Sequence, residues 1–192
     1  MALLHANADI VPTKLELLAD WLPAQPWFVG DASDVHHVGA YRFDDPDGEV
    51  GIETHLVRVG DGPLLQVPLT YRAAPLEGAE SHLLGTMEHS VLGTRWIYHA
   101  TGDPAYRAVL ATTILTGGTQ AELVRDFGDG RVEVAEPRVR VQGSGAPGSD
   151  VAQVDLEVVE VLDGAAPVGD EVLTGTWRDV TEPVVLAVAR LR

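Results

Sequence analysis

Three β-type segments separated by two turn sequences constrain the fold of this chain most. The segments are residues 35–43, 49–59 and 64–72, and each is rich in β-branched and aromatic residues. The turns, residues 44–48 and 60–63, both combine proline with glycine. Because proline fixes φ and glycine supplies positive φ, these turns predict an antiparallel meander. Pro68 predicts that its own strand lies at a sheet edge or carries a bulge.

A helix is expected on each side of this meander. Residues 12–22 carry leucines at helical spacing, with a proline tolerated in the first turn and another proline just past the end. The second helix is expected to start with Asp103 as N-cap and Pro104 as its first residue, and to end at Gly117.

The remaining segments predict strands and one long loop. We expect residues 73–95 to be irregular and Trp96 to begin a short strand. Further strands are expected at residues 121–127, 131–141, 151–162, 172–177 and 184–191. Residues 142–150, rich in Gly and Ser, are expected to form a flexible hairpin loop. Residues 1–192 are thus expected to form a single α+β domain.

Charge excludes two classes of partner. The chain has 29 acidic and 13 basic residues, a formal charge of −16, and no basic cluster. Nucleic acid and anionic membrane surfaces require such clusters, so neither is an expected partner. No window approaches the roughly 20 apolar residues of a membrane span, and the first residues lack the features of a signal peptide. We therefore expect a cytoplasmic protein.

No motif predicts a cofactor or a metal ion. Residues 143–148 spell G-x-G-x-x-G, but Pro147 interrupts them and a strand rather than a helix is expected to follow. Glu53 and His55 share a strand face, yet a metal site needs three or four converging ligands. Cysteine is absent. Neither a metal nor another cofactor is expected.

Catalytic sequence patterns are also missing from these 192 residues. Lys14 is the only lysine and lies in the first expected helix, so the kinase set of phosphate loop, strand lysine and two aspartates has no candidates. An active site assembled in space from His and carboxylate groups, or from Ser81 or Ser90 beside a histidine, stays open as a third possibility.

Several stretches, taken in order, resemble a known family. They are residues 14–28 (KLELLADWLPAQPWF), 67–72 (VPLTYR), 75–78 (PLEG), 84–86 (LGT), 93–100 (GTRWIYHA) and 103–104 (DP). This order is similar to the N-terminal cap domain of maltokinases and related sugar kinases, over residues 10–115. His99 stands where the family often has aspartate.

The resemblance implies a fold and a role. The implied fold is a cystatin-like cap, a curved antiparallel β-sheet with two main helices. Because kinase lobes do not follow, we expect a non-catalytic, stand-alone cap that acts as a binding or regulatory module. Its expected partner is a separate kinase or an enzyme of glucan metabolism, linked to α-glucan, trehalose or sugar-phosphate metabolism.

The alternative function is a small-molecule binding protein with a pocket on the curved sheet. A small sugar or sugar phosphate would be the ligand, with aromatic rings against sugar faces and arginine for an anionic group. The candidate ligand-binding residues are Glu53, His55, Tyr71, Arg72, Trp96 and Tyr98. Ordinary sheet packing and surface charge are the other explanation for all six.

Overall fold

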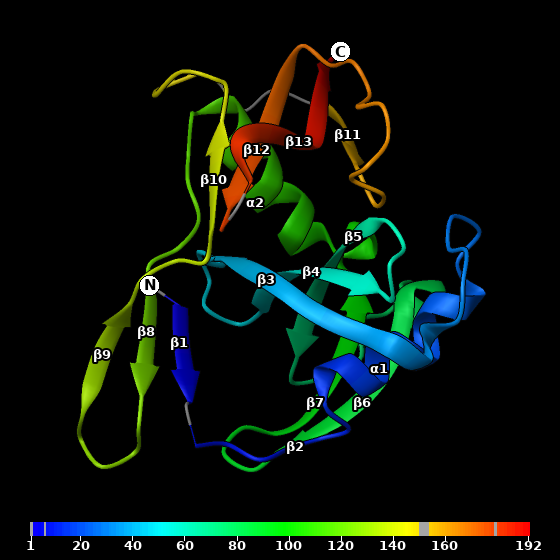
Figure 1. Ribbon diagram of the computed structural model, residues 1–192. Helices are drawn as coiled ribbons and strands as arrows, with labels where there is room; N and C mark the ends of the chain where they lie inside the picture. The colour runs from blue at the N-terminus through cyan, green and yellow to red at the C-terminus, as the bar shows by residue number, and fades with distance from the viewer. Residues whose placement is uncertain (1, 6, 150–153, 179) are drawn as a thin grey trace.

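The strands of this protein form three sheets in a computed structural model that describes residues 2–5, 7–149, 154–178 and 180–192 (Figure 1). The six-stranded sheet has the order β2 (Ile10–Val11), β6 (Leu83–His89), β7 (Gly93–His99), β5 (Leu64–Arg72), β4 (Gly51–Val59) and β3 (Val35–Phe43). The four-stranded sheet has the order β10 (Val139–Gly143), β12 (Glu171–Trp177), β13 (Val180–Leu191) and β11 (Val154–Val158). The three-stranded sheet has the order β1 (Ala2–His5), β8 (Leu123–Asp126) and β9 (Val132–Ala135).

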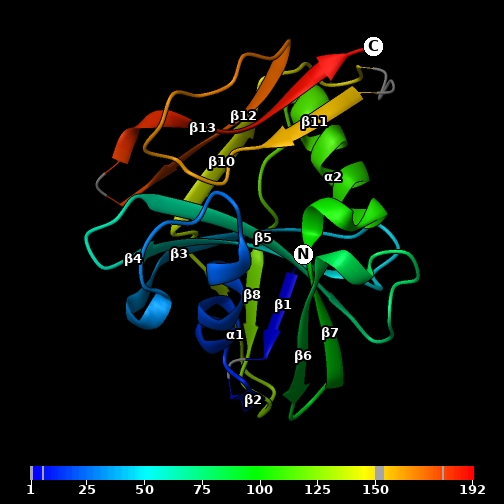
Figure 2. The same ribbon diagram turned by 90° about the vertical axis from the view of Figure 1, so that its right-hand side faces the viewer.

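Two helices pack on opposite faces of the six-stranded sheet. This sheet is antiparallel and curls strongly into a half-barrel. Helix α1 (Lys14–Trp21) packs inside the curve, and α2 (Pro104–Leu115) packs between the other face and the four-stranded sheet (Figure 2). Four short 3-10 helices complete the list: η1 (Leu22–Ala24), η2 (Ala32–Asp34), η3 (Glu80–His82) and η4 (Ala100–Gly102). The expected α+β class, with a curved antiparallel sheet and two main helices, is confirmed.

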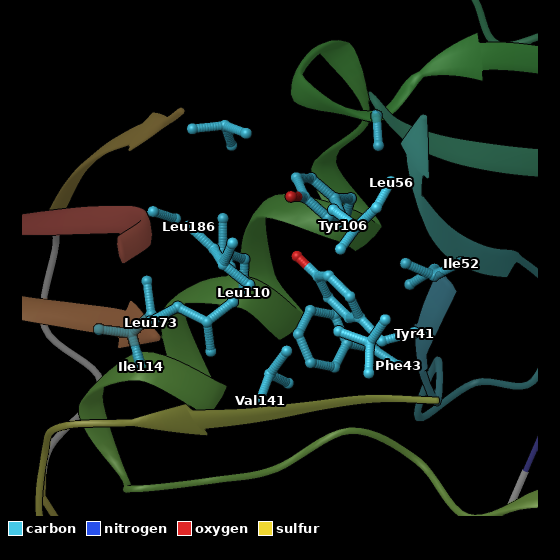
Figure 3. Close-up of a cluster of buried hydrophobic side chains, with 14 of the residues drawn as sticks. Tyr41, Phe43, Ile52, Leu56, Tyr106, Leu110, Ile114, Val141, Leu173 and Leu186 are labelled. Carbon is cyan, nitrogen blue, oxygen red and sulfur yellow. The ribbon is translucent and has the colours of Figure 1, made fainter. Parts of the chain in front are cut away.

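The sheet therefore buries side chains on both of its faces. On the face toward α1, called the α1 face, Leu17 and Leu18 pack against Val57, Val67 and Ile97. On the opposite face, called the α2 face, aromatic and aliphatic side chains meet α2 and the four-stranded sheet. Figure 3 shows this second cluster: Tyr41, Phe43, Ile52 and Leu56 from the six-stranded sheet, Tyr106, Leu110 and Ile114 from α2, and Val141, Leu173 and Leu186 from the four-stranded sheet.

The predicted beginning of α2 is confirmed. Asp103 is its N-cap, and the carboxylate accepts a hydrogen bond from the backbone N–H of Ala105 at 2.9 Å. The same carboxylate accepts two hydrogen bonds from Arg72, both at 2.7 Å. Asp103 thereby joins the helix to β5.

Helix α1 begins later than its proline suggests. Its N-cap is Thr13, which forms a capping box with Glu16, so Pro12 lies just before the helix. In the capping box the backbone N–H of Thr13 donates to the Glu16 carboxylate, and the backbone N–H of Glu16 donates to the Thr13 hydroxyl.

The prediction that residues 73–95 are irregular is wrong. They contain all of β6 and the first residues of β7, which pair with one another. The strand signal is weak because β6 alternates poorly: most of its side chains are exposed or half-buried, and Gly85 interrupts the register with φ of 153°.

Pro68 does not lie on an edge strand, because β5 has neighbours on both sides. On one side, β5 pairs with β7 along its second half and with residues 160–162 along its first half, and Pro68 lies between these two parts. Pairing of β5 with β7 begins at Leu69, whereas the backbone N–H of Gln66 donates to the carbonyl of Glu160 on that same side. A residue without an N–H is tolerated at such a gap in the ladder.

The predicted hairpin loop at residues 142–150 has a different connectivity. The segment leads from β10 to β11, which are not neighbours in their sheet, so it is not a hairpin loop. Gly145 donates to the carbonyl of Ile114, and a Cβ at Gly145 would lie 2.0 Å from the carbonyl oxygen of Leu115. Glycine is thus required for this segment to pass the last turn of α2. Residue 150 lies outside the described residues.

The C-terminal strands broadly follow the prediction. β8 and β9 form the expected antiparallel pair, but the single strand expected at 131–141 is divided into β9 and β10 around Pro137. β11 begins at Val154, and the three preceding residues of the expected strand lie outside the described part of the chain. Among the helices of the described ranges the longest, α2, has 12 residues, too few for a membrane span.

Candidate functional site

A buried carboxylate organises the polar part of the α1 face. Glu53 on β4 is 7% exposed. It accepts hydrogen bonds from Lys14 of α1 and, at 3.1 Å, from Nε of Arg42 directly opposite on β3. The Tyr71 hydroxyl donates to its Oε2 at 3.2 Å, and Nε2 of His55 lies 3.2 Å from the same oxygen. We call these five residues the Glu53 cluster.

The cations of this cluster keep Glu53 ionised. Burial by itself favours the neutral acid, but the charges of Lys14 and Arg42, together with the hydrogen bond from His55, hold the pKa of Glu53 well below its usual range. Burial and the nearby Glu53 carboxylate raise the pKa of Tyr71 well above its ordinary value, so the phenol stays protonated and donates. The cluster therefore holds a buried anion between two fixed cations.

His55 is the member of the cluster that has a buried polar atom without a hydrogen-bond partner among the described residues. It is 3% exposed, and burial lowers the pKa of its ring, which is therefore neutral at pH 7. Because Nε2 faces the Glu53 carboxylate, the proton belongs on Nε2 and Nδ1 is an acceptor. Nδ1 is buried and has no hydrogen-bond donor among the described residues.

A cavity of about 720 Å³ opens beside the cluster, and we call it the α1-face cavity. Lys14, Arg42, Glu53 and His55 lie along it. The opposite wall comes from residues 121–125 on and before β8 and from residues 136–138 between β9 and β10. Its volume lies within the range of about 300–1,000 Å³ that small-molecule sites occupy.

The six residues predicted from the sequence divide between the two faces of the sheet. Glu53, His55 and Tyr71 come together in the Glu53 cluster, with 3.1 Å between Nε2 of His55 and the Tyr71 hydroxyl. Arg72, Trp96 and Tyr98 lie on the other face, since neighbouring residues of a strand point to opposite sides.

The second group has structural partners. Arg72 pairs with Asp103 at the start of α2, and the Tyr98 hydroxyl accepts a hydrogen bond from the backbone N–H of Leu76 at 2.8 Å. Trp96 lies half-buried, directly opposite Arg72. The structure does not bring these three residues to the α1-face cavity.

Sequence reasoning missed four basic residues along the cavity: Lys14, Arg42, Arg125 and Arg138. Lys14 carries a signal in hindsight, because it is the only lysine of the chain and lies on the polar edge of an apolar helix. Arg125 and Arg138 carry no local signal, since they reach the cavity only through the pairing of β8 and β9.

The described residues of the cluster provide fixed charges rather than a set of metal ligands or an activated nucleophile. Within the part of the chain that the structure describes, no group of three His, Asp or Glu residues is placed to hold a metal ion. Glu53 is neutralised by two cations and cannot serve as a base near neutral pH, while the Tyr71 hydroxyl keeps its proton. What the cavity offers is fixed charge and one free acceptor.

Fold and site together define a class: an α+β module whose curled antiparallel sheet holds a helix and a charged cluster inside its curve. Residues 21–103 match the family model of the maltokinase N-terminal cap domain, which confirms the resemblance for that region. The matched family describes a cap domain, which is not itself catalytic. No curated protein matches the chain at a significant level.

The match covers only part of the candidate site. It includes Arg42, Glu53 and His55, but neither Lys14 nor the cavity wall at residues 121–138. That wall is a feature of this chain outside the matched region.

Proposed function

We propose that this protein is a non-catalytic, cap-like binding module whose ligand is a small molecule held in the α1-face cavity. The observation that carries the proposal is the Glu53 cluster beside that cavity. Burying charge costs several kcal/mol per ion, and apolar side chains of similar size would fill the same space without that cost. A buried charged cluster open to a cavity is therefore better explained by a ligand than by stability.

The family match supports a carbohydrate-related ligand for this proposal. The matched family is named for maltokinase, an enzyme that acts on a sugar. We accordingly propose a sugar or sugar derivative as the ligand. The imidazole of His55, which lines the cavity, is compatible with a polyol, because imidazole exchanges hydrogen bonds with hydroxyl groups.

The test is ligand binding with and without a blocked cavity. Differential scanning fluorimetry would be run with glucose, maltose, trehalose, glucose 1-phosphate and glucose 6-phosphate. A ligand at 100 times its Kd stabilises the folded state by about 2.7 kcal/mol, which raises Tm by several degrees. Ala40→Phe places a ring in the α1-face cavity and is expected to abolish this rise, because Ala40 lines that cavity opposite His55.

A matched control separates blockage from general damage. Ala108→Phe makes the same substitution in a different cavity, on the exposed side of α2. This variant is expected to respond to the ligand as the unmodified protein does. No rise in Tm with any of the five sugars would contradict the small-molecule proposal.

A second candidate function is docking on a separate protein, and one surface favours it. Val132 and Val134 are 60% and 61% exposed on β9, which is the last strand of its sheet. An edge strand with exposed apolar side chains is a ready site for adding a strand from a partner. The proposed partner is a sugar kinase or a glucan-metabolism enzyme. If pull-down of such an enzyme is unchanged by Val132→Thr with Val134→Thr, this candidate is wrong.

A further inference from the structure

We propose that the ligand of the α1-face cavity is a small anion that also carries a hydroxyl group, such as a phosphorylated or carboxylated sugar. This inference rests on the proposed function, because it names the chemical class that the same cavity binds. Two independent features of the described residues lead to it: the charge of the cavity and the free acceptor on His55.

The charge of the cavity is opposite in character to that of the chain. Four basic residues line it against three acidic ones, Asp9, Glu53 and Glu136, in a chain with 13 basic and 29 acidic residues. Composition alone would give a cavity of this protein more acids than bases. The basic residues are therefore concentrated here by the fold.

A second cavity of about 690 Å³ shows the contrast. It lies between the turn at residues 44–47 and α2, and four carboxylates line it with no Lys, Arg or His. The two cavities are similar in volume and differ in charge. An anion is attracted to the α1-face cavity and repelled by the second cavity.

Two of the four cations are available to a ligand. Lys14 and Arg42 are neutralised in part by Glu53, and Glu136 is engaged outside the cavity by Arg140 at 3.1 Å. Arg125 is half-buried and Arg138 exposed, and neither forms an ion pair within the described ranges. A guanidinium without a carboxylate partner binds phosphate or carboxylate groups in bidentate geometry.

The unpaired acceptor on His55 is the reason for expecting a hydroxyl group on the ligand. Of the four buried polar atoms without a partner in the described residues, Nδ1 of His55 belongs to the one residue that lines this cavity. A buried acceptor without a partner destabilises the folded state, and a hydrogen-bond donor from the ligand would remove this cost. The ring centroid of the neighbouring His37 lies 5.8 Å from that of His55. Loss of solvation, followed by the effect of His55, lowers the pKa of His37, so this ring is neutral at pH 7. A hydroxyl group is the small donor that carries no charge of its own.

The anionic group and the hydroxyl group are therefore expected to bind at opposite sides of one cavity. Arg125 and Arg138 belong to the outer wall, and His55 belongs to the sheet. A ligand that spans them needs its charged group and its hydroxyl group on different atoms. Inorganic phosphate satisfies only the first requirement, and a neutral sugar satisfies only the second.

The experiment is isothermal titration calorimetry with four probes: glucose 6-phosphate, gluconate, glucose and inorganic phosphate. The expected order places the two hydroxylated anions at least tenfold tighter than glucose and than inorganic phosphate. Glucose 6-phosphate against gluconate decides between a phosphate and a carboxylate as the preferred anion. The protein used is the full 192-residue chain.

Substitutions test which residues contact the anionic group and which residue contacts the hydroxyl group of the ligand. Arg125→Ala with Arg138→Ala is expected to weaken the binding of glucose 6-phosphate at least tenfold. Arg107→Ala, which removes an exposed arginine of α2 outside the cavity lining, is expected to leave this binding unchanged. His55→Gln keeps a donor for Glu53 and removes the Nδ1 acceptor, so it is expected to reduce the affinity for glucose 6-phosphate to that for inorganic phosphate. Circular dichroism melting of each variant shows whether it is folded.

The outcomes separate this inference from the proposed function. If glucose binds as tightly as glucose 6-phosphate and the double arginine variant binds as the unmodified protein does, the cavity is a ligand site. The inference that its ligand is an anion is then wrong. If inorganic phosphate binds as tightly as glucose 6-phosphate, the hydroxyl requirement is wrong. If none of the probes binds the folded protein, both the inference and the proposed function fail.

Discussion

The two faces of the six-stranded sheet treat buried polar groups in different ways. On the α2 face Gln66 is 1% exposed and neutral: its amide donates to the carbonyls of Val159 and Leu186, and its oxygen accepts from Tyr41. On the α1 face Glu53 is also buried, at 7% exposed, but it is charged and lies beside a cavity.

This difference indicates that one face of the sheet contributes to stability, whereas the other face carries the proposed binding site. The neutral network on the α2 face ties the six-stranded sheet to the four-stranded sheet inside an apolar cluster. The charged network on the α1 face holds cations in place at a cost that packing elsewhere must offset. Substitutions on the α2 face should therefore change stability alone, and substitutions on the α1 face should change stability and binding together.

The largest expected effect comes from the α2 face. Leu110 is 1% exposed within the cluster of Figure 3, so Leu110→Ala removes buried methyl groups and leaves a cavity. The expected loss is about 3–4 kcal/mol in the free energy of unfolding, measured by urea denaturation. Ligand affinity of the remaining folded protein should not change. A parallel loss of affinity would mean that the two faces are not independent.

The next largest loss of stability is expected from a substitution on the α1 face. Glu53→Gln leaves Lys14 and Arg42 without their counter-ion, each with a side chain only about one fifth exposed. We expect a loss of about 3 kcal/mol in the free energy of unfolding, measured by the same denaturation.

A triple variant is the control for that prediction. Lys14→Met, Arg42→Leu and Glu53→Leu together remove the charges as a set, and Tyr71 and His55 can still pair with each other. This variant should be at least as stable as the unmodified protein. It should bind ligand more weakly, because Glu53 no longer holds the proton of His55 on Nε2. A triple variant as unstable as Glu53→Gln would show that the charges stabilise the fold.

The third effect is a pH dependence confined to the α1 face. His99 on β7 is 7% exposed and stacks on Trp21 of α1 at 5.1 Å between ring centroids. Burial, with a smaller contribution from His82, lowers the pKa of His99 to about 4. The unfolded chain, with a histidine pKa near 6.5, therefore takes up the proton first as the pH falls.

The resulting stability is fully present above about pH 6.5 and is lost as the pH falls toward 4. Between pH 7 and pH 5 this one group should cost about 2 kcal/mol, measured by urea denaturation at each pH. His99→Phe preserves the stacked ring and should make the decline over this interval smaller by that amount. An identical decline in both proteins would assign the acid sensitivity to other groups.

The sequence predicted the elements whose signals are local. β3 and β5 were predicted with their observed bounds because turns with proline and glycine delimit them. β6 was missed because one side of it faces solvent and a glycine breaks its alternation. The connection of β10 to β11 was misread because its glycines are required by α2, which lies about 30 residues earlier in the chain.

The candidate site was likewise predictable only where its residues lie close together in the sequence. Alternation along β4 places Glu53 and His55 on one face, and the structure brings them within hydrogen-bonding distance. No local pattern links Glu53 to Lys14, which lies on a helix, or to Arg125 and Arg138 across the cavity. Alternation also separates Tyr71 from Arg72, and attention to it would have divided the six candidates in advance.

The pairing of β1 with β8 has a consequence for the order in which the protein is made. It joins Ala2 to Leu123 in parallel register, so β1 is synthesised long before the strand that it pairs with. Residues 14–58, which provide the inner side of the cavity, can fold against one another well before then. The wall with Arg125 and Arg138 is synthesised later, and pairings between residues so distant in sequence form slowly. A nascent chain thus carries an open, charged sheet surface until β8 and β9 have been synthesised, and the proposed ligand site is completed only after that point.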